Sequence, residues 1–208
     1  MATTGDGGTA SEDEVRGLWG TDPRIYAQMR PDAASLAHLR SLQEALPRRP
    51  GLRLATPARL HLTLIHFGRV RDVHAVLQAA VPGLDEEVFT AALGEYLQAT
   101  RAVLPARSVT FDPVGTAGFG PGGRVLVVEY RPAPELLAVH AALYAVLERF
   151  LHRCGVQDID AFTAGDPNFR HAARLRPHIT LARGWNGAPP ALSPLEPVTL
   201  EPMPVLYR

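Results

Sequence analysis

Two short segments of this chain share a pattern of residues that could do acid and base chemistry. Residues 59–64 read RLHLTL and residues 176–181 read RPHITL, so each places a histidine two residues before a threonine and two after an arginine. Two imidazoles can divide acid and base work near neutral pH, one accepting a proton while the other donates one. Threonine hydroxyls can donate hydrogen bonds to phosphoryl oxygens as charge develops on them. If the two segments meet, the pattern favours phosphodiester chemistry without a metal.

Each segment reads as a β-strand with a polar face and an apolar face. Successive side chains of a strand alternate between its two faces. In the first segment this predicts one face with Arg59, His61, Thr63 and Ile65 and a core face with Leu60, Leu62 and Leu64. In the second it predicts Arg176, His178 and Thr180 on one face, with Ile179 and Leu181 opposite. Each histidine and threonine would therefore point away from the core.

The elements around these strands repeat the order strand, helix, motif strand. Strands are predicted at 24–29, 59–67, 107–112, 124–130, near 176–183 and in the C-terminal PVTLEPMPVLY, and helices at 31–46, 72–80, 85–104 and 134–154. A polar stretch from 155 to about 173 reads as a long loop. The order predicts an α+β fold of two pseudo-symmetric lobes, each an antiparallel sheet with helices on its outer face, and an active-site cleft between them.

Composition limits the kinds of partner this chain would bind. Its formal net charge is zero, so there is no overall basic field to hold long nucleic acid, and no apolar run approaches the roughly 20 residues of a membrane helix. All 21 basic residues are arginine, which suits bidentate phosphate contacts. The single cysteine, Cys154, lies on a predicted helix and is interpreted as a packed thiol.

The N-terminal segment shows no secretory signal. Residues 1–14 have neither a basic start nor an apolar run, which favours a disordered tail over residues 1–20 before one bilobal domain over 21–208. We therefore expect a cytoplasmic, monomeric protein that does not bind membranes.

The two motif segments resemble the signature of a known family. The paired HLTL and HITL resemble the signature of the two-histidine (2H) phosphoesterase superfamily, and in particular its bacterial RNA 2',3'-cyclic phosphodiesterases, also called 2'-5' RNA ligase-like proteins. The resemblance runs from about residue 24 through ARLHLTLIHFG, the middle strand pair and LRPHITLAR. It implies that His61 and His178 are the catalytic acid and base, that Thr63 and Thr180 bind phosphate, and that Arg183 contacts substrate. It implies no cofactor.

The chain departs from that family in three places. The family usually has an apolar residue where this chain has His66, and residues 155–173 match it poorly. Strict alternation places His66 on the face opposite His61, so His66 is interpreted as a packed or rim residue and no metal site is expected. Alternation also points Arg183 away from His178, so its role requires a bend, which Gly184 would permit.

Two arginines and a glycine-rich segment are further candidates for binding phosphate. Arg59 and Arg176 each precede a motif histidine by two residues on the same predicted face, and are either substrate-binding or solvated. The glycine-rich segment 115–124 lacks the Lys-Ser/Thr of a phosphate loop and is interpreted as a connection between strands.

The leading functional hypothesis is an enzyme that opens 2',3'-cyclic phosphates on RNA ends or small nucleotides. Cleavage of another small phosphodiester, such as a 2'-5' linked or cyclic oligonucleotide or ADP-ribose cyclic phosphate, is an alternative. A non-catalytic module that binds nucleotides or RNA ends is another. Two titrating histidines argue against pure binding.

Overall fold

The computed structural model describes residues 12–203 and 206–207, and within them an antiparallel sheet is flanked by six α-helices. The helices are α1 (Glu12–Thr21), α2 (Ala33–Glu44), α3 (Val70–Ala80), α4 (Glu86–Val103), α5 (Pro134–Arg153) and α6 (Ile159–Gly165). The strands are β1 (Arg24–Pro31), β2 (Arg53–Leu54), β3 (Leu62–Arg69), β4 (Val109–Phe111), β5 (Pro113–Phe119), β6 (Val125–Tyr130), β7 (His178–Arg183), β8 (Val198–Pro202) and β9 (Leu206–Tyr207). The predicted α+β class is confirmed.

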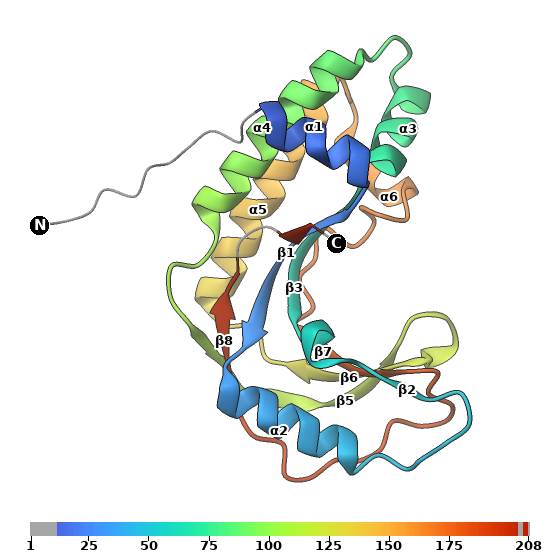
Figure 1. Cartoon of the computed structure of the whole chain (residues 1–208), viewed down its shortest axis with the longest axis vertical. Helices are drawn as coiled ribbons and strands as arrows, with labels where there is room; N and C mark the ends of the chain where they lie inside the picture. The colour runs from blue at the N-terminus through green and yellow to red at the C-terminus, as the bar shows by residue number, and fades with distance from the viewer. Residues whose placement is uncertain (1–11, 204–205, 208) are drawn as a thin grey trace, which may run out of the picture.

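The sheet has two halves that meet at one residue pair. Its strand order is β4-β8-β1-β3-β7-β6-β5, with β2 beside β7 and β9 beside β1. Strands β3 and β7 are joined by the single register pair Leu62 and Ile179. The upper half in Figure 1 carries α1, α3, α4 and α5, and the lower half carries α2. The predicted two-lobed arrangement therefore corresponds to the two halves of one continuous sheet.

Each motif strand packs against the helix that precedes the other motif strand in the sequence. Helix α2 precedes β3 in sequence, yet its residue Gln43 donates from Nε2 to the Leu181 carbonyl of β7 at 2.7 Å. Helix α5 precedes β7, yet it packs on β3, where Phe150 meets Phe67 at 5.1 Å between ring centroids. The expectation that each half supplies its own strand, helix and motif strand is wrong in this respect. Each motif strand is instead buried by the helix that precedes the other one.

The apolar face of both motif strands forms the core, as alternation predicts. The core residues of the two motifs are each at most 2% exposed: Leu60, Leu62, Leu64, Ile179 and Leu181. Cys154 is also buried, and burial raises the pKa of its thiol to about 12, which agrees with a packed and unreactive cysteine. In the described part of the chain no helix is long and apolar enough to span a bilayer.

Three segments differ from the sequence prediction. Residues 1–11 of the predicted tail lie outside the described residues, but residues 12–20 belong to α1, because Val15 and Leu18 are buried in the core. The predicted loop 155–173 contains α6, whose first turn is capped by the Asp158 carboxylate accepting from the Ala161 N–H at 2.9 Å. The first half of the glycine-rich connection, residues 115–119, belongs to strand β5, which pairs with β6.

Candidate active site

The register between β3 and β7 brings the two motifs together on one face of the sheet. Because Leu62 lies opposite Ile179 in an antiparallel pair, His61 lies across from Thr180, and Thr63 across from His178. Leu62 and Ile179 are both buried, so the four polar side chains share the opposite face. Directly opposed Cβ atoms lie about 5 Å apart and diagonal ones about 7–8 Å. By this register the two histidines are diagonal neighbours, and both line the same pocket as the two threonines.

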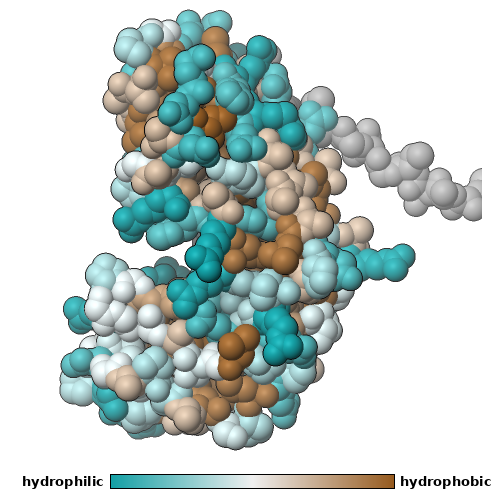
Figure 2. Space-filling view, turned by 180° about the vertical axis from the view of Figure 1, so that it is seen from behind, coloured by the Kyte–Doolittle hydropathy of each residue, from teal (hydrophilic) through white to brown (hydrophobic). Residues whose placement is uncertain are grey.

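These four residues open into a cleft with two arms. The arginine arm, of about 730 Å³, is lined by His61, Thr180 and five arginines: Arg24, Arg53, Arg59, Arg69 and Arg183. The loop arm, of about 550 Å³, is lined by Phe119 and by several residues between 168 and 176, including Asn168, His171 and Arg174. The two arms share Thr63, His66 and His178. In Figure 2 the molecule is hollowed between its two halves, with hydrophilic side chains around the hollow.

A β-bulge interrupts the alternation of each motif strand at the same position. On β3 the register shifts between the pairs made by Ile65 and Thr63, so Leu64 is the extra residue. On β7 it shifts between the pairs made by Ala182 and Thr180, so Leu181 is extra. A bulge returns the following residues to the opposite face. Two neighbours in each strand are therefore buried in succession, and the residue after them points into the cleft.

The residues turned into the cleft by the bulges are His66 and Arg183. His66 lines both arms, so its predicted placement on the face opposite His61 is wrong, and so is that of Ile65, which is 2% exposed. Arg183 lines the arginine arm as its expected role requires, although the change of direction occurs at Leu181 and not at Gly184. Alternation could not predict either side chain, because bulges depend on strand pairing.

The two arginines that precede the motif histidines lie just outside the strands. Arg59 ends a 3₁₀-helix (Pro57–Arg59) and β3 begins only at Leu62, so its predicted position on the strand is wrong, but it still lines the arginine arm. The Arg176 guanidinium pairs with Glu129, with 2.7 Å between Nε and Oε1, and lies 4.1 Å from the Phe119 ring centroid. Arg176 therefore already has partners in the protein.

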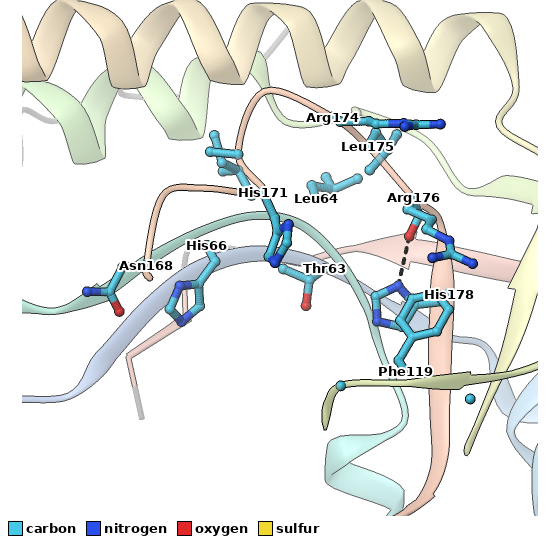
Figure 3. Close-up of a pocket in the computed structure, with 14 residues that line it drawn as sticks. Thr63, Leu64, His66, Phe119, Asn168, His171, Arg174, Leu175, Arg176 and His178 are labelled. Carbon is cyan, nitrogen blue, oxygen red and sulfur yellow. Dashed lines mark hydrogen bonds between the residues drawn. The ribbon is translucent and has the colours of Figure 1, made fainter. Parts of the chain in front are cut away.

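His178 is held in one orientation by its own main chain and by neighbouring side chains. Its Nδ1 lies 2.7 Å from the Arg176 carbonyl, as Figure 3 shows, and its ring contacts Phe119 at 4.6 Å between centroids. Desolvation lowers the pKa of His178, while the Arg176 carbonyl and the Glu129 charge partly oppose that shift. In the neutral ring Nδ1–H donates a hydrogen bond to this carbonyl, which leaves the Nε2 lone pair for chemistry.

His61 is positioned differently, by an aromatic neighbour. Its ring stacks on that of Tyr26, with centroids 5.5 Å apart and planes 13° apart. Tyr26 also stacks on His66, at 6.2 Å and 20°. Tyr26 belongs to β1 and lines the arginine arm, and the sequence analysis did not single it out. Only the pairing of β1 with β3 shows its place beside both histidines.

The loop arm was also missed, because its residues come from the segment that was predicted to be a long loop. This segment is anchored firmly. Phe169 is 1% exposed and packs on Phe67, with 6.2 Å between ring centroids. The Asp166 carboxylate accepts a hydrogen bond from the Asn168 N–H at 2.7 Å. Residues 166–176 therefore form an ordered wall of the cleft.

Comparison with known proteins identifies the family of the chain. The family described as the 2'-5' RNA ligase superfamily matches residues 30–190. The chain belongs to that superfamily of 2H phosphoesterases. No curated protein matches the chain. Among solved structures, TT0787 of Thermus thermophilus has a TM-score of 0.53 and 20% identity, and the match covers 89% of this chain and 93% of that one.

Two other similar structures are of E. coli LigT. The LigT structure complexed with phosphate has a TM-score of 0.45 and 14% identity, covering 89% of this chain and 96% of that chain. The LigT structure complexed with 3'-AMP has a TM-score of 0.46 and 16% identity, covering 89% and 97%. At these identities the likeness concerns the fold.

The cleft of this superfamily member is rich in histidine, since His61, His66, His171 and His178 all line it. Among the described residues, however, no group of three or more histidine, cysteine or acidic side chains is arranged to hold a metal ion. The arrangement can do acid and base chemistry with the side chains themselves, next to arginines that can bind an anion.

Proposed function

We propose that this protein is a phosphodiesterase that opens 2',3'-cyclic phosphates of RNA ends or small nucleotides, with His61 and His178 as acid and base and without a metal. One observation supports the proposal: both histidines and both motif threonines line one arm of the cleft, on the two strands that the Leu62–Ile179 pair joins. A single phosphate in that arm contacts all four side chains. Such positioning accounts for a large part of the rate of a two-step proton transfer.

In this mechanism His178 is the base. Its Nδ1 is engaged by the Arg176 carbonyl, and desolvation lowers its pKa, so the ring is neutral and its Nε2 can accept a proton from water. The water oxygen bonds to phosphorus, and the bond from phosphorus to the 2' or 3' oxygen breaks. His61 donates a proton to that leaving oxygen. The product is a phosphomonoester beside a free hydroxyl, and the two histidines have exchanged protonation states.

The threonines and arginines supply the remaining groups. Thr63 and Thr180 donate hydrogen bonds to the non-bridging phosphoryl oxygens, whose charge grows in the transition state. Arg183 binds the phosphate bidentately from the arginine arm. Five arginines gather there although the whole chain has zero net charge, so the positive potential is concentrated where the anion binds.

Turnover on a panel of substrates tests the proposal. The panel contains 2',3'-cyclic nucleotides, RNA with a 2',3'-cyclic phosphate end, 2'-5' oligonucleotides, cyclic dinucleotides and ADP-ribose cyclic phosphate, all with excess chelator. We expect ring opening of the 2',3'-cyclic phosphates. The variant in which both His61 and His178 are alanine, purified in parallel, controls for contaminating nucleases.

Three other results of this panel would contradict parts of the proposal. Preferential cleavage of another diester would replace the substrate, and binding without turnover of any of them would make the protein a binding module. Activity that chelator abolishes and a divalent ion restores would exclude the metal-free mechanism.

A further inference from the structure

His66 occupies the place in the β3 half of the cleft that Arg183 occupies in the β7 half. Each residue lies five positions after its motif histidine, and each follows a bulge, at Leu64 in β3 and at Leu181 in β7; a second bulge of β3, at Phe67, comes after His66. The register pair Leu62–Ile179 lies midway between the two motifs, so His66 and Arg183 extend from opposite ends of the same phosphate site. Arg183 offers a cation there. His66 offers an imidazole.

The His66 ring has an aromatic neighbour and a polar one. It stacks on Tyr26, with 6.2 Å between ring centroids, and lies near the main chain of Asn168. Asn168 in turn packs on β3, since a Cβ atom added to Gly68 would lie 3.4 Å from the Asn168 side chain. Figure 3 shows His66 and Asn168 together at one end of the loop arm, with His171 between them and His178. Because the ring lines both arms of the cleft, a ligand bound there can reach it.

The same surroundings disfavour a charged imidazole. Desolvation lowers the pKa of His66, and the positive charge of Arg24 lowers it further, against the opposing effect of the Asn168 main chain. A neutral imidazole is a hydrogen-bonding group suited to a neutral polar partner. Next to it the loop arm presents an amide, a second imidazole and the side chains of Leu64 and Leu175. These groups suit the ribose and base of a nucleoside.

We infer that His66, set beside Asn168 on the wall of the loop arm, hydrogen-bonds the nucleoside of the substrate and so makes this enzyme selective for cyclic phosphates that carry one. The inference rests on the proposed function. The phosphate sits between His61 and His178, Arg183 holds its anionic side, and the nucleoside extends toward His66.

The test compares two substrates that share the five-membered cyclic phosphate. One is 2',3'-cyclic AMP and the other is glycerol 1,2-cyclic phosphate, which lacks ribose and base. For His66→Phe we expect kcat/KM on the cyclic nucleotide to fall by about 3- to 10-fold, the effect of one hydrogen bond, mainly through KM. On the glycerol substrate we expect no change. His66→Gln, which retains a hydrogen-bonding group, should recover part of the loss.

His152→Phe is the matched control, because His152 is an exposed histidine in the last turn of α5, away from the cleft. Equal losses on both substrates would overturn the inference and assign His66 to the phosphate or to folding, which thermal unfolding of each variant separates. No loss on either substrate would also overturn it. If the wild type turns over neither substrate, the proposed function fails by itself.

If the wild type turns over neither substrate, the binding of 3'-AMP still tests the role of His66. Calorimetry with 3'-AMP and with inorganic phosphate should show His66→Phe weakening the nucleotide and sparing phosphate. Equal affinity of wild type and variant for 3'-AMP would overturn the inference independently of turnover.

Discussion

The β3 half and the β7 half of the cleft are built in the same way and end in different chemistry. Each presents a histidine, then a threonine, then a bulge, and then a side chain that the bulge turns into the cleft. In the β7 half that side chain is Arg183, and in the β3 half it is His66. The same backbone geometry in both strands therefore gives two equivalent positions, and the different side chains there, His66 and Arg183, make the site asymmetric. An asymmetric site is what a substrate with one anionic and one nucleoside end requires.

The two motif histidines also differ in what holds them. His178 is bound through Nδ1 to a carbonyl and lies near the Glu129 carboxylate, whereas His61 stacks on the phenol ring of Tyr26. A base and an acid need different pKa values, and different surroundings are how a protein sets them. Under the proposed function, we assign the base to the β7 half. Three predictions test it, from the largest expected effect to the smallest.

The largest effect should come from replacing the motif histidines. His61→Ala and His178→Ala should each lower kcat on 2',3'-cyclic AMP by about 10²- to 10⁴-fold, because each removes one proton transfer. The double variant should lose less than the product of the two, since the pair acts as a unit. Steady-state kinetics with chelator present measures all three. If either single variant has wild-type activity, the histidine replaced in that variant takes no part in the chemistry.

A smaller effect is expected from the arginine at the end of β7. Arg183→Lys should raise KM by about 5- to 10-fold with little change in kcat, because lysine keeps the charge but loses the bidentate contact with phosphate. Arg176→Lys is the matched change in the same half. Since the Arg176 guanidinium already pairs with Glu129, we expect a smaller change in KM. If Arg183→Lys matches the wild type in both constants, the β7 half does not hold the anion.

The smallest effect should be a displacement of the pH profile. If both histidines titrate, kcat/KM traces a bell against pH. The Glu129 charge raises the pKa of His178, and the Arg176 charge lowers it. Glu129→Gln removes the negative charge and leaves the Arg176 guanidinium without its carboxylate partner. The pKa of His178 should therefore fall. With His178 as base, the acidic limb of the bell moves to lower pH.

The same experiment can reverse the assignment of roles. Movement of the alkaline limb to lower pH would make His178 the acid and His61 the base. An unmoved profile would show that Glu129 does not affect the catalytic pair. Glu95→Gln, which removes an exposed carboxylate of α4 paired with Arg153, should leave both limbs in place.

Much of the fold followed from local patterns. Alternating leucines in RLHLTL and RPHITL predicted the core faces of the motif strands, and the helical spacing of apolar residues predicted α2, α3, α4 and α5 to within three residues at each end. Helices α1 and α6 and strand β5 were missed. Helix α1 was predicted as part of the N-terminal tail, α6 is a single short helix in a polar stretch, and β5 is rich in glycine, so none of them has a strong local pattern.

The chain by itself determined which residues could do the chemistry, because two histidines with paired threonines are a matter of residue type and spacing. Tertiary structure alone decided how they are arranged. The β3–β7 register sets each histidine against the threonine of the other motif, and the bulges at Leu64 and Leu181 turn His66 and Arg183 into the cleft. Pairing between strands more than a hundred residues apart creates the first feature, and pairing with the neighbouring strands β1 and β6 creates the second. Because a one-residue shift reverses the face of every following side chain, local alternation could not have predicted them.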